Sequence, residues 1–162
     1  MANWCSNRVQ FDCTPETMEK IIAFFDELQA KGDKENCGQL PPFIKADIGF
    51  MFDIYWADGL LYYNTKWSPN IDIMVAIADH FGASFTYSYD EMGMLIYGEA
   101  EYKCGVLTDI CLGWDEMQSY SYDEEKNVYL FEGEEYESDY EILDTLLERK
   151  KYQLEHTDFI KN

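Results

Sequence analysis

The sequence predicts a two-layer α+β fold of the ferredoxin-like type, an antiparallel sheet with both helices on one face. Three observations support this prediction: short runs that alternate apolar and polar residues, two apolar stripes at helical spacing that each follow a cap-plus-proline start, and a strand-helix-strand order in both halves. The chain has 162 residues, of which 47% are hydrophobic and 17% aromatic. That length and composition suffice for a sizeable core.

The first strand and the first helix follow directly from the opening residues. Val9, Phe11 and Cys13 alternate with polar neighbours, which is typical of a half-buried strand. Thr14-Pro15 then supplies a capping hydroxyl and a proline suited to the first helical position. Gly32 is expected to end this helix. Its predicted apolar face consists of Met18, Ile21, Ile22, Phe25 and Leu28.

The middle of the chain predicts a loop, a strand and a second helix. Residues 33–58 contain glycines and prolines without clear periodicity and are expected to form a loop with space for a short helix. Residues 60–67 follow the Asp58-Gly59 turn as a strand. Ser68-Pro69 is expected to start the second helix, which Gly82 ends. Its apolar stripe is Ile71, Met74, Val75, Ala78 and Phe81.

Three more strand candidates lie at 85–89, 94–102 and 106–112, so the predicted order is β-α-β-α-β-β. This pattern defines a core domain over residues 1–114. Residues 115–162 form an acidic, tyrosine-rich extension that ends in a helix, and we expect it to pack on the core within a single structural domain.

The extension has an unusual composition. Between Asp115 and Glu141 there are 11 acidic residues and one basic residue, Lys126. Residues 128–131 are a short strand candidate, and residues 138–141 match a helix capping box. The helix that follows carries an apolar face of Ile142, Leu143, Leu146 and Leu147.

The net charge and the absence of targeting signals limit which partners the protein can bind and in which cellular compartment it is expected. The net charge of −20 argues against direct binding to nucleic acid or to anionic lipid. No apolar run approaches the length of a membrane span, and the N-terminus lacks the pattern of a signal peptide. Five cysteines without a C-x-x-C pair are expected to be reduced thiols. These features together predict a cytoplasmic protein with no membrane partner.

The residue pattern argues against most catalytic chemistries. The cysteines are too far apart for an iron–sulfur cluster, and the two histidines, His80 and His156, are isolated, so we expect no metal site and no cofactor. Motifs for nucleophilic catalysis or phosphate binding are missing. Glu99 and Glu101 share one face of a predicted strand, a spacing compatible with a hard cation or an acid–base pair, but a chance pair is the simpler interpretation among 32 acidic residues. We therefore expect no catalytic residues.

Three segments also carry a family resemblance. Met1-Ala2-Asn3-Trp4-Cys5-Ser6-Asn7, Thr65-Lys66-Trp67-Ser68-Pro69 and Tyr89-Asp90-Glu91-Met92-Gly93 with Gly98-Glu99 resemble the YubB-type ferredoxin-like family, whose members are carried by phages, plasmids and other mobile elements. The likeness spans about residues 1–112. It implies the ferredoxin-like topology and brings no activity and no catalytic residues.

The functional expectation is a non-enzymatic protein whose acidic surface binds a basic partner protein, such as a nucleic-acid-handling or defence protein. A dense array of carboxylates imitates the potential of a nucleic-acid backbone, and aromatic residues anchor the contact. The candidate partner-binding residues are Asp123, Glu124, Glu125, Glu132, Glu134, Glu135, Tyr136, Glu137, Trp4 and Trp67. Two alternatives remain open: a homo-oligomeric module joined by its sheet or by an exposed strip along Ile142, Leu146 and Leu147, and a cation-dependent carboxylate enzyme.

Overall fold

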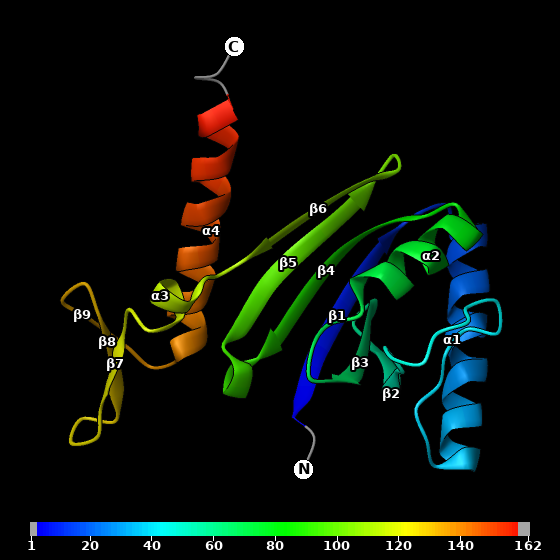
Figure 1. Ribbon diagram of the computed structural model, residues 1–162, viewed down its shortest axis with the longest axis horizontal. Coiled ribbons are helices and arrows are strands. Elements are labelled where there is room, and N and C mark those ends of the chain that lie inside the picture. The colour runs from blue at the N-terminus through cyan, green and yellow to red at the C-terminus, as the bar shows by residue number, and fades with distance from the viewer. Residues whose placement is uncertain (1–2, 159–162) are drawn as a thin grey trace. The chain divides into compact units, whose positions relative to one another are not determined.

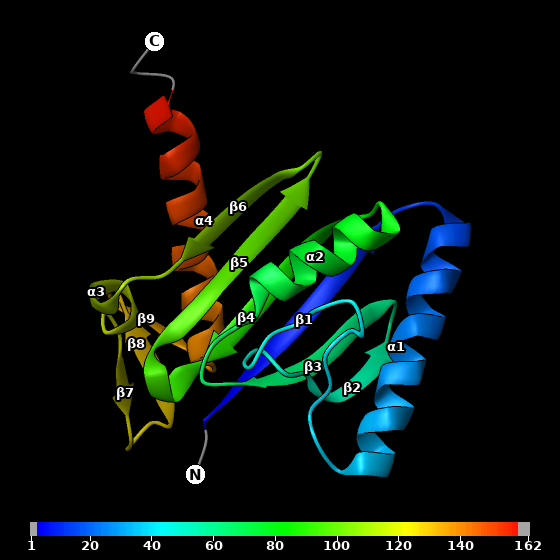
Figure 2. The same ribbon diagram turned by 45° about the vertical axis from the view of Figure 1, so that its right-hand side comes forward.

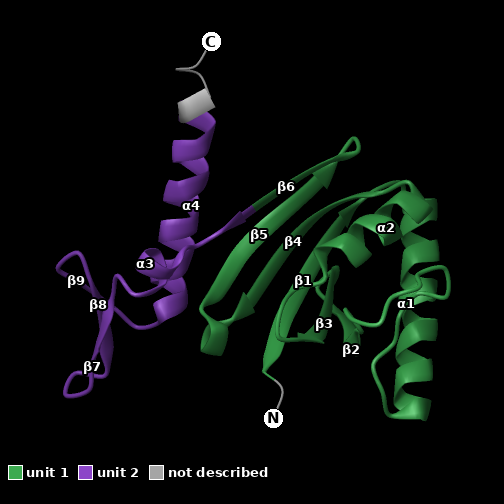
Figure 3. Ribbon diagram, viewed as in Figure 1, with its two compact units in different colours: residues 1–109 green, residues 110–162 purple. Residues whose placement is uncertain are grey.

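The computed structural model describes residues 3–158 and divides the chain into two compact units, Met1–Asp109 and Ile110–Asn162 (Figure 3). We call them unit 1 and unit 2 and describe each by itself. The elements that begin in unit 1 are β1 (Trp4–Asp12), α1 (Pro15–Glu35), β2 (Phe52–Ala57), β3 (Leu60–Lys66), α2 (Ile71–Phe81), β4 (Ser84–Glu91), the 3-10 helix η1 (Met92–Met94), β5 (Ile96–Lys103) and β6 (Val106–Cys111).

Unit 1 is built on a six-stranded sheet with the order β2-β3-β1-β4-β5-β6 (Figure 1). Its first elements run β1-α1-β2-β3-α2-β4, and the pairs among these four strands are all antiparallel. A β-α-β-β-α-β order with β1 and β3 in the middle of the sheet is the ferredoxin-like arrangement. The predicted fold class is therefore confirmed, and β5 and β6 widen the sheet beyond β4.

The structure adds one strand that the sequence interpretation missed. β2 lies inside the expected 33–58 loop and pairs with β3 across the Asp58-Gly59 turn, where both residues have positive φ (52° and 77°). A register shift between Phe52 and Tyr55 interrupts β2. A bulge of this kind breaks the alternation of apolar and polar residues by which strands are recognised, so the segment lacked the expected pattern.

The first helix begins where the sequence predicts and ends later. Thr14 caps it by accepting a hydrogen bond from the Thr17 N–H at 3.3 Å. The expected stop at Gly32 is wrong, because α1 continues to Glu35 and ends at Asn36, whose φ is 50°. After glycine, Asn is one of the residues most often found in this left-handed conformation at the end of a helix.

The second helix begins at Ile71, two residues after the proline that was expected to start it. Asn70 is its N-cap residue, but the Asn70 side chain makes no capping hydrogen bond. Its Oδ1 accepts from the Tyr63 hydroxyl at 2.7 Å and its Nδ2 donates to the Gly49 carbonyl at 2.8 Å. Tertiary hydrogen bonds thus set the start of α2.

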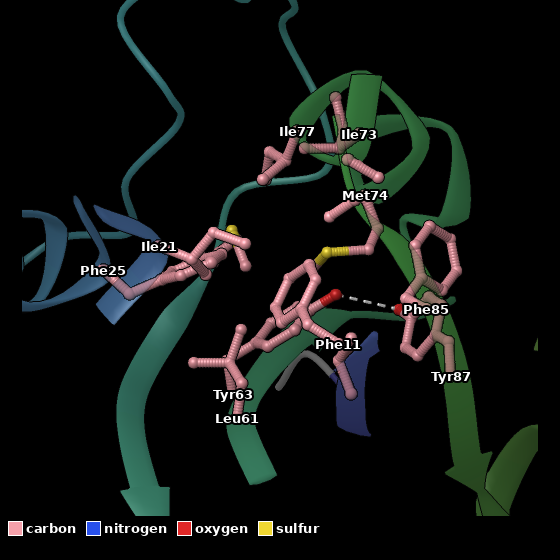
Figure 4. Close-up of a cluster of buried hydrophobic side chains, with 14 of the residues drawn as sticks. Phe11, Ile21, Phe25, Leu61, Tyr63, Ile73, Met74, Ile77, Phe85 and Tyr87 are labelled. Carbon is pink, nitrogen blue, oxygen red and sulfur yellow. Dashed lines mark hydrogen bonds between the residues drawn. The ribbon is translucent and has the colours of Figure 1, made fainter. Parts of the chain in front are cut away.

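Both helices cover the same face of the sheet (Figure 2). Ile21 and Phe25 of α1 and Met74 and Ile77 of α2 are fully buried against alternate residues of the strands, including Val9 of β1. Figure 4 shows this cluster with the buried rings of Tyr63 and Tyr87, which are joined by a hydrogen bond of 3.1 Å. Burial raises the pKa of both hydroxyls. The helices thus leave the opposite face of the sheet without a helical cover from unit 1.

Unit 2 contains α3 (Trp114–Met117), β7 (Ser121–Asp123), β8 (Val128–Phe131), β9 (Glu134–Tyr136) and α4 (Asp139–Asp158). The expected strand at 128–131 is confirmed as β8. Ser138 Oγ accepts a hydrogen bond from the Tyr140 N–H at 3.2 Å, as expected for a cap at the start of α4. The exposed strip that the homo-oligomer alternative would place on α4 does not form, because Ile142 and Leu147 are at most 5% exposed.

Candidate functional site: the acidic 121–137 sheet

Two tight turns fold residues 121–137 into a small antiparallel sheet with the order β7-β8-β9. In the first turn, Asp123 Oδ1 accepts hydrogen bonds from the backbone N–H groups of Glu125 and Lys126, at 3.0 and 3.2 Å. The second turn consists of Glu132 and Gly133, both with positive φ (50° and 88°). Two central residues of positive φ match the right-handed twist of the strands that they connect.

Tyrosines occupy the middle of this sheet. Tyr129 of β8 pairs with Tyr122 of β7 and with Tyr136 of β9, and the rings of Tyr122 and Tyr129 lie 5.0 Å apart. The Tyr122 hydroxyl donates to Asn127 Oδ1 at 2.6 Å. Cross-strand aromatic pairs of this kind stabilise small sheets. The tyrosines thus help to hold the surrounding carboxylates in a defined arrangement.

The predicted acidic residues fall into two groups. In the first group, the carboxylate already has a partner within unit 2. Glu132 receives two hydrogen bonds from the Arg149 guanidinium, at 2.7 and 2.8 Å, which lower the pKa of that carboxyl. Glu135 forms an ion pair with Lys126. Asp123 belongs to this group through its two backbone contacts in the turn.

The second group consists of Glu124, Glu125, Glu134 and Glu137. All four are exposed, and in the described part of the chain no hydrogen bond or ion pair holds their side chains. The strands of the sheet are three or four residues long, which corresponds to roughly 10–13 Å. The four carboxylates therefore lie on a sheet small enough for one partner to contact all of them.

The basic residues in the described part of unit 2 already form ion pairs. Lys126, Arg149, Lys150 and Lys151 are the basic residues between positions 110 and 158, and each forms an ion pair with a carboxylate of the same unit. Residues 110–162 carry 15 acidic and 5 basic residues, so this third of the chain holds −10 of the net charge of −20. Among residues 110–158, no basic side chain is left without an ion pair to neutralise the second group.

Trp4 and Trp67, the two other predicted anchors, lie in unit 1. Each is 47% exposed, so neither is a core residue. The Trp4 ring meets the Phe52 ring edge-to-face at 5.0 Å. Trp67 follows β3 with a φ of 72°, and its N–H donates to the Asn3 carbonyl at 2.9 Å. A bulky residue in this backbone region is strained, and such strain is common at functional positions.

The structure also brings together the three segments that carry the family resemblance. Trp4 lies opposite Lys66, and Ser6 lies opposite Asp90 in the register of the sheet. Near them, one carboxylate oxygen of Glu91 accepts from the Gly93 N–H at 3.1 Å, while the other is buried without a hydrogen-bond partner. Sequence reasoning named these segments without predicting that they meet at one end of β1.

The remaining reactive groups have structural surroundings. Burial of Cys5, aided by nearby carboxylates, raises the pKa of its thiol to about 12, so this thiol is not nucleophilic near neutral pH. The His80 ring stacks on Phe43 with 4.1 Å between centroids. Glu99 and Glu101 share the helix-free face of β5, as predicted. Among residues 3–158, no group of three or more His, Cys, Asp and Glu residues is arranged to hold a metal ion.

A cavity of about 230 Å³ lies between the end of α1 and β2, and the sequence interpretation gave no sign of it. Asp33, Cys37, Gln39 and Asp53 line part of it. Gln39 is buried, and its Nε2 donates to Glu35 Oε2 at 3.1 Å. The Gln39 side-chain nitrogen is thus already bonded within the chain, and the cavity gives no separate indication of a ligand.

Comparison with known families decides the relationship of the chain. The family model described as the ferredoxin-like domain in Api92-like protein matches residues 51–132, half of the chain. The chain belongs to this family. The family segment runs from the start of β2 to the β8–β9 turn and so includes β7, β8 and Glu132, but it omits β1 and α1. Searches of curated proteins and of solved structures find no match.

None of the helices among the described residues has the length and apolarity needed to cross a bilayer.

Proposed function

We propose that this protein is a non-enzymatic binding protein whose 121–137 sheet engages a basic partner protein. The observation that carries the proposal is the charge state of this sheet. Glu124, Glu125, Glu134 and Glu137 are exposed without bonded cations, while the basic residues of unit 2 between positions 110 and 158 are paired elsewhere. A partner with lysines or arginines would supply the missing counter-charges.

The order of the sheet supports its use as a binding surface. The two turns and the Tyr122–Tyr129 contact hold the strands, so ordering this surface adds little to the cost of binding. Tyr122 is 48% exposed and offers a rigid aromatic surface beside the carboxylates. A partner that normally binds nucleic acid would present a matching arrangement of cations, because duplex DNA carries about one negative charge per 1.7 Å of its axis.

The biological setting is part of the proposal. The YubB-type resemblance and its link to phages and plasmids point to a cytoplasmic protein that acts on a nucleic-acid-handling or defence protein of its host. Mimicry of nucleic acid needs neither a cofactor nor catalytic residues. The three classes of function are a binding protein, a homo-oligomeric module and a cation-dependent carboxylate enzyme. Of these, the binding protein is the one that uses the acidic 121–137 sheet.

The test compares two variants of equal charge change. In the site variant, Glu124, Glu125, Glu134 and Glu137 are replaced by Gln. In the control variant, four exposed acids of unit 1 are replaced by the matching amides: Glu19→Gln, Asp26→Asn, Glu27→Gln and Asp47→Asn. Both variants and the wild type are used to capture proteins from a host lysate, and each captured protein is then purified and titrated against all three.

We expect one basic protein to bind the wild type and the control, and to bind the site variant at least about 10-fold more weakly. Binding should also weaken as salt is raised from about 0.05 M to 0.3 M, because the screening length of exposed charges falls from about 14 Å to about 6 Å over this range. Equal loss of binding in both variants would show that net charge alone is responsible and would refute the assigned site.

A further inference from the structure

The carboxyl group of Glu91, the last residue of β4, is buried with one of its oxygens unsatisfied. The residue is 7% exposed. Its Oε1 accepts a hydrogen bond from the Gly93 N–H at 3.1 Å, whereas Oε2 is buried without a hydrogen-bond partner. A charged group that is taken out of water is costly unless its charge is balanced and its oxygens are bonded. Glu91 therefore needs a partner for Oε2.

In the described part of the chain, no cation balances the charge of Glu91. No lysine, arginine or histidine of residues 3–158 forms an ion pair with it. The groups nearby add negative charge or none. Burial, together with the charges of Asp90 and Glu91, raises the pKa of the Cys5 thiol to about 12, so this thiol is uncharged near neutral pH. The end of β4 is thus a buried position of negative potential.

Strand pairing brings segments that are distant in the sequence together at Glu91. Cys5 of β1 pairs with Thr65 of β3. One step beyond the Ser6–Asp90 pair, the same register places Cys5 opposite Glu91. Cys5 and Thr65 are fully buried, so this row lies on the side of the sheet that the helices cover. The surroundings of Glu91 are therefore set by packed strands.

Asn3 supplies a second polar side chain beside Glu91. A Cβ atom placed on Gly93 would lie 3.0 Å from both Glu91 Oε1 and Asn3 Nδ2, so these two side chains are close neighbours. The Asn3 backbone is held, because its carbonyl accepts from the Trp67 N–H at 2.9 Å. No hydrogen bond among the described residues fixes the Asn3 side chain. A half-turn of this amide places its oxygen where the nitrogen now lies, so both side chains can present oxygen atoms.

We propose that Glu91 and Asn3 hold a small monovalent cation, sodium or potassium, at this end of the sheet. Glu91 Oε2 supplies the negative charge and one ligand, and the Asn3 amide oxygen supplies a second. Backbone carbonyl oxygens and water complete the shell of such an ion. The ion would link the start of β1 to the end of β4, so we expect it to stabilise unit 1.

The choice of a monovalent cation follows from charge, burial and ligand type. A carboxylate only accepts, so it does not bind an anion, and a buried Oε2 is closed to the side chain of a partner protein. Divalent and transition metals favour several charged or soft ligands, whereas no three His, Cys, Asp or Glu residues among positions 3–158 gather around one point. One negative charge with neutral oxygen atoms matches one positive charge. The net charge of −20 also concentrates cations around the chain.

Thermal unfolding of the full chain, followed by circular dichroism, tests the proposal. The protein is measured in about 0.2 M sodium, potassium or tetramethylammonium chloride, which screen charge equally. Tetramethylammonium is too large for an enclosed position. We expect the Tm to be about 4–8 °C higher in sodium or in potassium than in tetramethylammonium. Replacing tetramethylammonium stepwise by the stabilising ion at constant chloride should give a saturating curve with one midpoint.

Three variants locate the ion. Glu91→Gln keeps an oxygen for the Gly93 N–H but removes the charge, so the difference in Tm between the salts should fall below about 1 °C. Asn3→Ala removes one ligand and should raise the midpoint of the ion titration by about 3- to 10-fold. The matched control is Glu101→Gln, at an exposed acid of the neighbouring strand β5, which should retain the full difference.

Equal Tm values of the wild type in the three salts would overturn the proposal and assign a water molecule or a proton to Oε2. This result depends on the wild type alone, so it is decisive even if Glu91→Gln does not fold. An unchanged ion effect in folded Glu91→Gln would also overturn it, because the ion then binds elsewhere. The 121–137 sheet lies in unit 2, so replacing its four glutamates should leave the ion effect intact, and the two proposals can fail separately.

Discussion

The buried hydroxyl of Tyr87 offers a sharp test of the fold. This hydroxyl donates to Asn7 Oδ1 at 2.6 Å and accepts from the Asn70 N–H, the N-cap of α2, at 3.3 Å. Both partners are buried, and Tyr87 itself is fully buried. Tyr87→Phe removes a single oxygen and leaves the ring in place, so its effect reports on these hydrogen bonds.

The expected cost of Tyr87→Phe follows from the two groups that it leaves unbonded. A buried polar group without a partner costs about 1–3 kcal/mol, and Tyr87→Phe affects the Asn7 oxygen and the Asn70 N–H together. Asn70 keeps its bonds to Tyr63 and Gly49, which limits the loss. We therefore expect the free energy of unfolding to fall by about 2–4 kcal/mol.

Urea denaturation followed by fluorescence measures this change, with Tyr62→Phe as the control. Tyr62 is the neighbouring tyrosine on the helix-free side of β3, and its hydroxyl makes no hydrogen bond recorded among the described residues. The control should change the free energy of unfolding by less than about 0.5 kcal/mol. If Tyr87→Phe is as mild as its control, the buried hydrogen-bond network does not contribute as argued here.

Three further predictions concern other parts of the chain. The pKa of Cys5 is raised from 9.0 to about 12 in the folded state, so the contribution of this thiol to stability is complete below pH 9 and is lost as pH rises toward 12. Denaturation at several pH values should show that the free energy of unfolding declines over this range by up to about 1.4 kcal/mol per pH unit. The decline should be smaller in Cys5→Ala. Gly38→Ala would place a Cβ atom 2.4 Å from the Phe52 ring, so thermal unfolding should show a loss of about 1–3 kcal/mol, and an unchanged Tm would contradict the close approach. Glu132→Gln removes the charge of an exposed ion pair with Arg149 and should leave the midpoint of urea denaturation nearly unchanged, whereas a clear fall in the midpoint would mean that this pair stabilises unit 2.

Local sequence signals located the elements whose environment is regular. The alternation around Val9 and the cap at Thr14 correctly predicted β1 and the start of α1, because each signal acts over a few neighbouring residues. The same reasoning failed for β2, where a bulge interrupts the alternation, and at Gly32, which the helix passes through. In both places the final structure depends on neighbours that are distant in the sequence.

In the candidate site, too, the sequence predicted some features and the tertiary structure decided others. Composition alone marked residues 115–141 as acidic, but it could not distinguish Glu132, which bonds Arg149, from Glu134, which has no bonded cation among the described residues. That distinction arises because the β8–β9 turn and α4 bring Arg149 to Glu132 across 17 positions of sequence. No local pattern carries that information.

The sequence by itself determined the ferredoxin-like fold class and the acidic character of the C-terminal third, because these depend on periodicity and composition. Only the tertiary structure decided which carboxylates remain without a counter-ion and that Asn3 lies beside Glu91 at one end of the sheet. Strand register places residues more than 50 positions apart opposite each other, and shifting it by one residue would move every side chain to the other face. The sites proposed here for binding exist because of that register.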